Sequence, residues 1–467
     1  MNFARSGERL RKLFSAQDMA QGAPWKRILE FSLPMLIGNL AQQMYNTADS
    51  VIVGHYVGDN ALAAVGSASP ILNLLLALFV GVSTGAGILV SQYYGAREKE
   101  NLANVIGNCV TLTFIVSAII MAVGPLVTRP LLGLLGTPDS IFDWCSDYLI
   151  IYFVGILGFA AYNILSGVLR GLGDSFSALA FLLVATVLNI GLDIWFVASF
   201  RMGVAGVALA TVIAQAISAV LCMIKLLKMQ DVFLLKPVHL RLCRIHAGKI
   251  ITLGVPSGVT QAIFSMAMLV VQSLTNSFGE MVIACNVIVM RVDGFAMMPN
   301  FTFGQAMTTY TGQNVGAGKI DRVRAGAKQG TLMALACAAI LTCCILVFGR
   351  NLMSIFTDTT ELVELSVHMM SILAVGYIAM AVTQSLSGVM RGAGDTMTPM
   401  WISIITTVIL RVPIAYGLAF LTRSESDPVG NPDSVFISLL VSWVLGALIT
   451  LVAYRTGKWR RKIPTVL

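Results

Sequence analysis

The chain has 467 residues, of which 57% are hydrophobic and only 12% charged, and its mean hydropathy is +0.81. A soluble chain of this length carries roughly twice that share of charged residues, so the composition excludes a soluble globular protein. The net charge of +8 therefore has to be read against membrane topology rather than as a sign of nucleic-acid binding.

Apolar runs long enough to cross ~30 Å of hydrocarbon recur along the chain. Their length and the lack of strand-like alternation predict helices rather than the strands of a barrel. We expect an all-α polytopic membrane protein with twelve transmembrane helices, at about residues 28–54, 61–91, 102–125, 141–169, 177–200, 204–228, 250–277, 282–312, 326–349, 361–390, 398–421 and 434–456.

In the first half, few ionisable residues fall within these spans. A charged residue deep in a span is costly and usually faces a cavity or a partner. Asp49 lies in the outer part of the first helix, and Asp193 lies in the fifth, four residues after Asn189 and so on the same helix face. Other polar residues in the spans of this half are Tyr148 and Asn163 in the fourth helix and Thr211 in the sixth.

The two acids permit more than one kind of chemistry. Two carboxylates in a low-dielectric pocket repel each other, so one of them can take up a proton, as proton-coupled transport requires. Alternatively, oxygen atoms of Asp49, Asn189 and Asp193 would suit a sodium ion. A purely structural role, in which the acids cap or join neighbouring helices, is also consistent with the sequence.

The second half carries different polar residues. Arg291 and Asp293 lie in the eighth helix, two residues apart and on different faces, while Arg411 lies mid-span in the eleventh. An ion pair between Asp293 and either arginine could shape a cavity, or could be structural only. Methionines, including Met290, and phenylalanines cluster in the seventh and eighth helices, where they suit either promiscuous ligand binding or ordinary helix packing.

Basic residues are distributed unevenly between the loops. With a cytoplasmic N-terminus, the outer side keeps only Arg129, Arg201, Arg350 and Arg423, whereas the other side receives the basic tails and a basic linker at 228–249. This bias predicts that both termini are cytoplasmic. Residues 1–27 have no signal-peptide core. We expect a multi-pass protein of the bacterial cytoplasmic (inner) membrane, whose basic segments face anionic lipid and not nucleic acid.

An internal repeat divides the chain. LSGVLRGLGDS at 165–175 returns as LSGVMRGAGDT at 386–396, and QYYGA at 92–96 returns as QNVGA at 313–317, both at an offset of 221 residues. The repeat predicts two six-helix bundles, 1–235 with the start of the linker and 236–467, with a central site opened alternately to each side. In each RGxGD motif, we expect glycine to end the helix and the arginine and aspartate to pair.

YNTAD with VGDNALAAVG, QYYGA, LSGVLRGLGD, LNIGLD and the second-half copies resemble the multidrug and toxic compound extrusion (MATE) family along essentially the whole chain, with greatest similarity to its DinF-like, MepA-type prokaryotic branch. The resemblance implies a V-shaped arrangement of two bundles, drug/proton or drug/sodium antiport, and cationic aromatic substrates. It also implies that the proton- or cation-binding network consists of Asp49, Tyr148, Asn163, Asn189, Asp193 and Thr211.

One departure concerns the second half, which has no acid between Pro256 and Gly279 and places Asp293 in the next helix, so a second cation site of the NorM type is not expected. The expected function is a monomeric secondary antiporter that exports amphipathic, often cationic organic compounds without a cofactor. The alternative is a flippase or exporter of a lipid-linked or narrow physiological substrate. No HExxH, nucleophile elbow or GxxxxGK[ST] loop occurs, which argues against an enzyme and against ATP-driven pumping.

Overall fold

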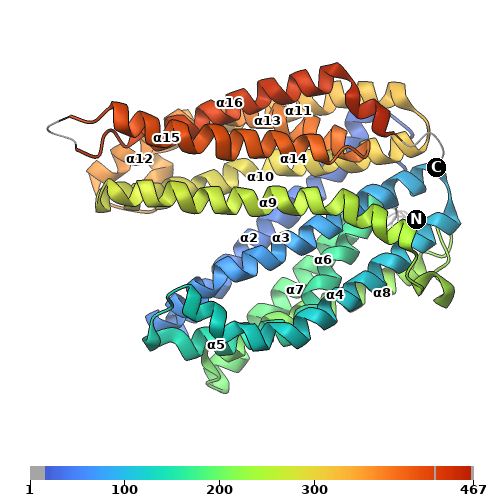
Figure 1. Ribbon diagram of the computed structural model, residues 1–467, viewed down its shortest axis with the longest axis horizontal. Coiled ribbons are helices and arrows are strands. Elements are labelled where there is room, and N and C mark those ends of the chain that lie inside the picture. The colour runs from blue at the N-terminus through green and yellow to red at the C-terminus, as the bar shows by residue number, and fades with distance from the viewer. Residues whose placement is uncertain (1–15, 425–427, 464–467) are drawn as a thin grey trace, which may run out of the picture. The chain divides into compact units, whose positions relative to one another are not determined.

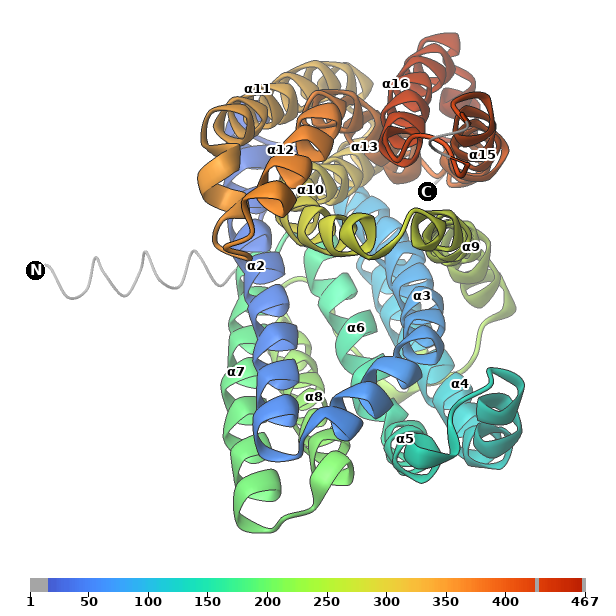
Figure 2. The same cartoon turned by 90° about the vertical axis from the view of Figure 1, so that its left-hand side faces the viewer.

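The computed structural model describes residues 16–424 and 428–463, without the side chains at positions 45, 46, 48–51, 59 and 62. The regular elements among these residues are all helices (Figures 1 and 2). The first half contains α2 (Pro24–Tyr56), α3 (Asp59–Ala96), α4 (Lys99–Leu134), α5 (Asp139–Val154), α6 (Ile156–Gly171), α7 (Ser175–Ile194), η1 (Trp195–Ser199) and α8 (Gly203–Lys228). The second contains η2 (Pro237–Leu240), α9 (Arg244–Ser277), α10 (Glu280–Gly316), α11 (Ile320–Met353), α12 (Thr360–Ala374), α13 (Gly376–Gly392), α14 (Met397–Ile404), η3 (Ile405–Leu410), α15 (Arg411–Leu421), α16 (Asp433–Thr456) and η4 (Lys458–Lys462).

Among the described residues, nine helices are long and apolar enough to cross a membrane, or eleven when each of two bent pairs counts as one span. Together with α2 they are consistent with the expected twelve spans, and the all-helical membrane fold is confirmed. The spans predicted at 141–169 and 361–390 are each divided into two helices, since α5 and α6 meet at 55° and α12 and α13 at 41°. Gly155 and Gly376 lie at the two breaks, and a Cβ on either would collide with a neighbouring side chain.

The repeat reappears as matching backbone contacts. A Cβ on Gly171 in α6 would lie 2.7 Å from the carbonyl oxygen of Gly87 in α3, and one on Gly392 in α13 would collide with the carbonyl oxygen of Thr308 in α10. Gly392 is the equivalent of Gly171, and Thr308 is the equivalent of Gly87, each at the offset of 221 residues. Small residues let transmembrane helices approach closely enough for extensive van der Waals contact. The pairs α3–α6 and α10–α13 are therefore equivalent packing centres of the two halves.

The two RGxGD motifs also fold alike. Gly173 and Gly394 have φ values of 84° and 97°, in the left-handed region that glycine adopts without strain. Each reverses the chain at the end of a helix, and the following helix begins two residues after Gly173, at Ser175, and three residues after Gly394, at Met397. Asp174 accepts hydrogen bonds from Ser177 N at 2.9 Å and Oγ at 2.7 Å. Asp395 accepts from the backbone N and Oγ1 of Thr398 at 3.1 and 2.7 Å.

The expected pairing of arginine with aspartate inside each motif is wrong. Asp174 lies 3.6 Å from Lys225 Nζ, and neither motif contains an ion pair within 4.0 Å among the described residues. A four-residue spacing brings side chains together only along a continuous helix, and the left-handed glycine interrupts it. Arg170 and Arg391 therefore end one helix, whereas the aspartates cap the next.

Replacing Asp395 with alanine should lower stability by about 1 kcal/mol, because it removes the acceptor of the first-turn amide of Thr398. The thermal unfolding midpoint in detergent, followed by tryptophan fluorescence, measures the effect. Asp358→Ala, at an exposed site outside any helix, is the matched control and should leave the midpoint unchanged. Equal midpoints for the two variants would contradict the capping role.

Contacts divide the described chain into two compact units. One contains residues 16–18 and Leu33–Gly258, and the other contains Met19–Ser32 and the chain from Val259 on. The division differs from the expected boundary after residue 235 because the first part of α9 packs on α3, where a Cβ on Gly254 would lie 2.7 Å from the carbonyl oxygen of Gly81. In the second unit, Gln313 and Asn314 of QNVGA hold Met19 through hydrogen bonds of 2.8 and 3.3 Å.

The basic linker is docked onto α4. His239 Nε2 lies 2.9 Å from Glu100 Oε1, Thr111 Oγ1 donates to Leu240 O at 2.6 Å, and Cys243 N donates to Asn108 Oδ1 at 2.7 Å. Such a set of bonds gives the segment a defined conformation, which the basic composition alone did not predict.

Candidate functional site

A buried polar cluster joins α7 to α8 in the first unit. Asn189 and Asp193 are 0% exposed and Thr211 is 6% exposed. With the Asn189 amide nitrogen facing the carboxylate, Nδ2 donates to Asp193 Oδ2 at 2.9 Å. Asn189 Oδ1 then accepts from Thr211 N at 3.2 Å and from Thr211 Oγ1 at 3.3 Å. We call these three residues the Asp193 cluster.

Helical spacing explains the contact between Asn189 and Asp193. Asn189 and Asp193 are one turn apart on α7, so their side chains meet along the same face. Thr211 comes from α8, which packs alongside α7. A carboxylate removed from water is stable only where hydrogen bonds, a proton or a cation compensate its charge. One carboxylate, one amide and one hydroxyl can hold either a proton or a hard cation such as sodium.

The other residues expected in this network are Asp49, Tyr148 and Asn163. The backbone of Asp49 belongs to α2, but its side chain lies outside the described residues. Tyr148 is buried, with its ring centroid 6.0 Å from that of Tyr152. Asn163 donates to Phe159 O of its own helix at 2.8 Å. The structure therefore brings together three of the six predicted residues by direct hydrogen bonds.

In the second unit, Asp293 accepts a hydrogen bond from the hydroxyl of Tyr377 at 2.9 Å. No ion pair within 4.0 Å joins Asp293 to Arg291 or Arg411 among the described residues, so neither expected pair forms as a direct contact. Arg291 is exposed and Met290 is half-buried. Tyr377 was not predicted, because a single tyrosine within the apolar span predicted at 361–390 has no distinctive pattern.

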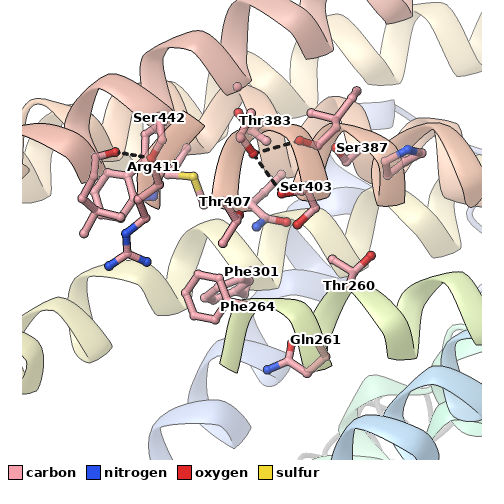
Figure 3. A pocket seen from close by; sticks show the side chains of 18 of the residues that line it. Thr260, Gln261, Phe264, Phe301, Thr383, Ser387, Ser403, Thr407, Arg411 and Ser442 are labelled. Atoms are coloured by element: carbon pink, nitrogen blue, oxygen red, sulfur yellow. Dashed lines mark hydrogen bonds between the residues drawn. The ribbon is translucent and has the colours of Figure 1, made fainter. Parts of the chain in front are cut away.

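A cavity of about 240 Å³ lies within the second unit, between α9, α10, α13, α14, η3, the start of α15 and α16 (Figure 3). The hydroxyls of Thr383 and Ser403 form one wall, and Thr260, Gln261 and Phe264 of α9 lie across from them. The whole lining consists of Thr260, Gln261, Phe264, Phe301, Met380, Thr383, Gln384, Ser387, Arg391, Pro399, Ile402, Ser403, Thr406, Thr407, Arg411, Leu439, Ser442, Trp443 and Gly446.

A π-helical segment shapes this cavity. The segment η3 contributes Thr406 and Thr407 to the lining and ends directly before Arg411. A π-turn adds a residue to the helical repeat and so changes which side chains face a given direction. Thr406 Oγ1 donates to Ile402 O at 2.9 Å. Of the predicted second-half residues, Arg411 lines the cavity, and the predicted methionine and phenylalanine cluster reaches it through Phe264 and Phe301. The serines and threonines were missed because single hydroxyls in apolar spans are common in helix packing.

In comparison with known proteins, one family model matches each half of the chain separately. The family model described as MatE matches residues 34–195 and 256–417. The probable multidrug resistance protein YpnP of Bacillus subtilis (strain 168) is 30% identical over 449 residues, covering 95% of this chain and 98% of that protein. Probable multidrug resistance protein YoeA of the same organism is 28% identical over 434 residues, covering 91% and 94%. A crystal structure of MATE in complex with MaL6 has a TM-score of 0.87 at 23% identity, covering 94% and 97%.

Proposed function

Because the chain belongs to the MatE (MATE) family, whose members are membrane transporters and not enzymes, we propose that it is a secondary active antiporter. In this proposal it exports amphipathic organic compounds by alternating access, in exchange for protons or sodium ions. It works as a monomer in the bacterial cytoplasmic membrane, with both termini cytoplasmic. It needs no cofactor, and the coupling ion is its only inorganic ligand.

The Asp193 cluster carries the coupling part of this proposal. A fully buried carboxylate within a membrane-spanning helix changes its charge when it binds a proton or a cation. That change alters the relative free energies of the conformations in which it is buried or accessible. The amide of Asn189 and the hydroxyl of Thr211 keep the carboxylate in a fixed position. Asp49 joins this proposal on the family resemblance alone.

Transport in proteoliposomes tests the proposal. Purified protein is reconstituted and loaded with a fluorescent amphipathic dye, and a pH gradient or a sodium gradient is imposed separately. We expect efflux against the dye gradient under one of the two conditions, because antiport needs only a single coupling ion. Collapsing the effective gradient with a protonophore or a sodium ionophore should stop it. Protein-free liposomes provide the control for passive leakage.

The outcomes separate the candidate functions. Efflux with the pH gradient alone assigns protons to the coupling site, and efflux with the sodium gradient alone assigns sodium. Folded protein that moves no dye under either gradient would contradict broad export and favour a flippase or an exporter of a narrow physiological substrate. Efflux that needs ATP would exclude secondary transport altogether.

A further inference from the structure

The second-unit cavity contains two arginine side chains and no acidic one. Arg411 is only 4% exposed, and Arg391 ends α13 on the same cavity. The Nε atoms of both are buried without a hydrogen-bond partner in the part of the chain that the structure describes. No aspartate or glutamate is among the described lining residues. Arg391 is half-buried near the end of α13, so the nearly fully buried positive charge of the lining is that of Arg411, and no acidic lining residue balances it.

Nearby acids compensate this charge only in part. Asp395 is close to Arg391 in sequence, but its carboxylate is engaged by the amide and hydroxyl of Thr398. Asp293 attracts Arg411 electrostatically, yet it lies beyond 4.0 Å and is bonded to Tyr377. An unbalanced buried charge within a membrane span is costly. A ligand that supplies a negative charge to the cavity would lower this cost.

The rest of the lining indicates what accompanies that charge. Phe264, Phe301 and Trp443 offer aromatic surface, while threonine and serine hydroxyls from α13, α14, η3 and α16 can donate hydrogen bonds. Guanidinium groups bind carboxylates and sulfonates through paired N–H donors. A volume of about 240 Å³ is smaller than the ~300–1000 Å³ usual for drug-sized ligands. The cavity therefore suits one small ring system with an acidic substituent.

We propose that this cavity binds a small aromatic organic anion, such as an aryl carboxylate, with its acidic group at Arg411 and its ring against Phe264, Phe301 and Trp443. The proposal deepens the proposed function, on which it rests, by naming a class of cargo. It departs from the cationic substrates that the family resemblance implied, because a cation would meet the like charge of Arg411 here.

Equilibrium binding to the full-length protein tests the charge preference directly. The protein in zwitterionic nanodiscs is dialysed against 2-naphthoate, its neutral isostere 2-naphthamide, or 2-naphthylmethylammonium, and bound probe is measured by naphthalene fluorescence. We expect naphthoate to bind at least about tenfold more tightly than the other two, consistent with a charge-assisted hydrogen bond. Equal affinities, or tighter binding of the cation, would overturn the proposal without any variant.

Variants then locate the site. Arg411→Gln should remove the preference for naphthoate and leave naphthamide binding unchanged, and Arg411→Lys should restore part of it. Arg350→Gln, at an exposed arginine of the same unit, is the matched control and should keep the full preference. A preference that survives in Arg411→Gln would overturn the assignment. Displacement of naphthoate by phosphatidylglycerol would assign Arg411 to a lipid headgroup and would also overturn it.

The binding experiment uses no ion gradient, so its result is independent of coupling. Tight naphthoate binding without gradient-driven efflux would contradict antiport and leave the anion site intact. Efflux of dyes without any anion preference would support antiport and contradict the anion site. One result can therefore contradict antiport without contradicting the anion site, and another can contradict the anion site without contradicting antiport.

Discussion

Replacing Asp193 with asparagine is expected to reduce gradient-driven efflux roughly 5- to 150-fold, the range that corresponds to a coupling free energy of about 1–3 kcal/mol. The carboxylate is fully buried and bonded to Asn189, so an amide of nearly the same size fits the site but neither gains nor loses a charge. Initial rates of dye efflux in proteoliposomes, with the effective gradient identified for the wild type, measure the loss.

The matched control is Asp143→Asn, at an exposed acid of the same unit whose pair with Arg129 lies on the surface. Surface ion pairs contribute little, so this variant should transport at the wild-type rate. Dye exchange without a gradient should persist in Asp193→Asn, because the packing is kept. Wild-type coupled efflux in Asp193→Asn would remove the Asp193 cluster from the mechanism. Asp49→Asn belongs in the same series as a test of the family resemblance.

Introducing leucine at Gly392 is expected to cost roughly 3 kcal/mol or more of stability, at the upper end of the usual penalty for overpacking. A Cβ there would collide with the carbonyl oxygen of Thr308 and lie 2.8 Å from Thr311 Cβ. These are atoms of the helix α10 itself, so no rotamer change makes room. We expect little folded protein after purification, or a strongly lowered thermal unfolding midpoint in detergent.

The equivalent substitution Gly171→Leu should have a similar effect in the first unit, because its Cβ would meet Gly87 O at 2.7 Å. Gly417→Ala is the control, since no atom lies within 4 Å of a Cβ added there. It should leave the midpoint unchanged or raise it slightly, because alanine favours helix. A midpoint for Gly392→Leu close to that of the wild type would refute close backbone packing between α10 and α13.

The helices could be predicted because each is a long apolar run in the sequence. The duplication could be predicted because two motifs recur at the same offset of 221 residues. The bends at Gly155 and Gly376 could not, because a glycine within an apolar run is compatible with a straight helix as well as a broken one. The pairing predicted for Arg391 and Asp395 failed for a related reason. A left-handed residue at Gly394 ends the helical repeat on which that prediction relied.

Of the candidate site, Asn189 and Asp193 could be predicted to meet because they are one helical turn apart. The contact with Thr211 depends on how α8 packs against α7, and no spacing in the sequence contains that information. The second-unit cavity was largely missed, since its hydroxyls are distributed over five elements and only Arg411 is unusual for its position. Tertiary packing, and not local pattern, creates that site.

The matching glycine contacts of the two halves have an evolutionary consequence. They imply that the chain arose by duplication of a gene of about half this length, so that the two halves began with the same polar residues. Fusion of two copies released each half from the requirement to be identical. The positions equivalent to Asn189 and Asp193 are now Leu410 and Ile414, while the second half carries Arg411 instead. The loss of symmetry lets the two halves carry different polar residues, as the proposed ion site in one half and the proposed cargo site in the other require.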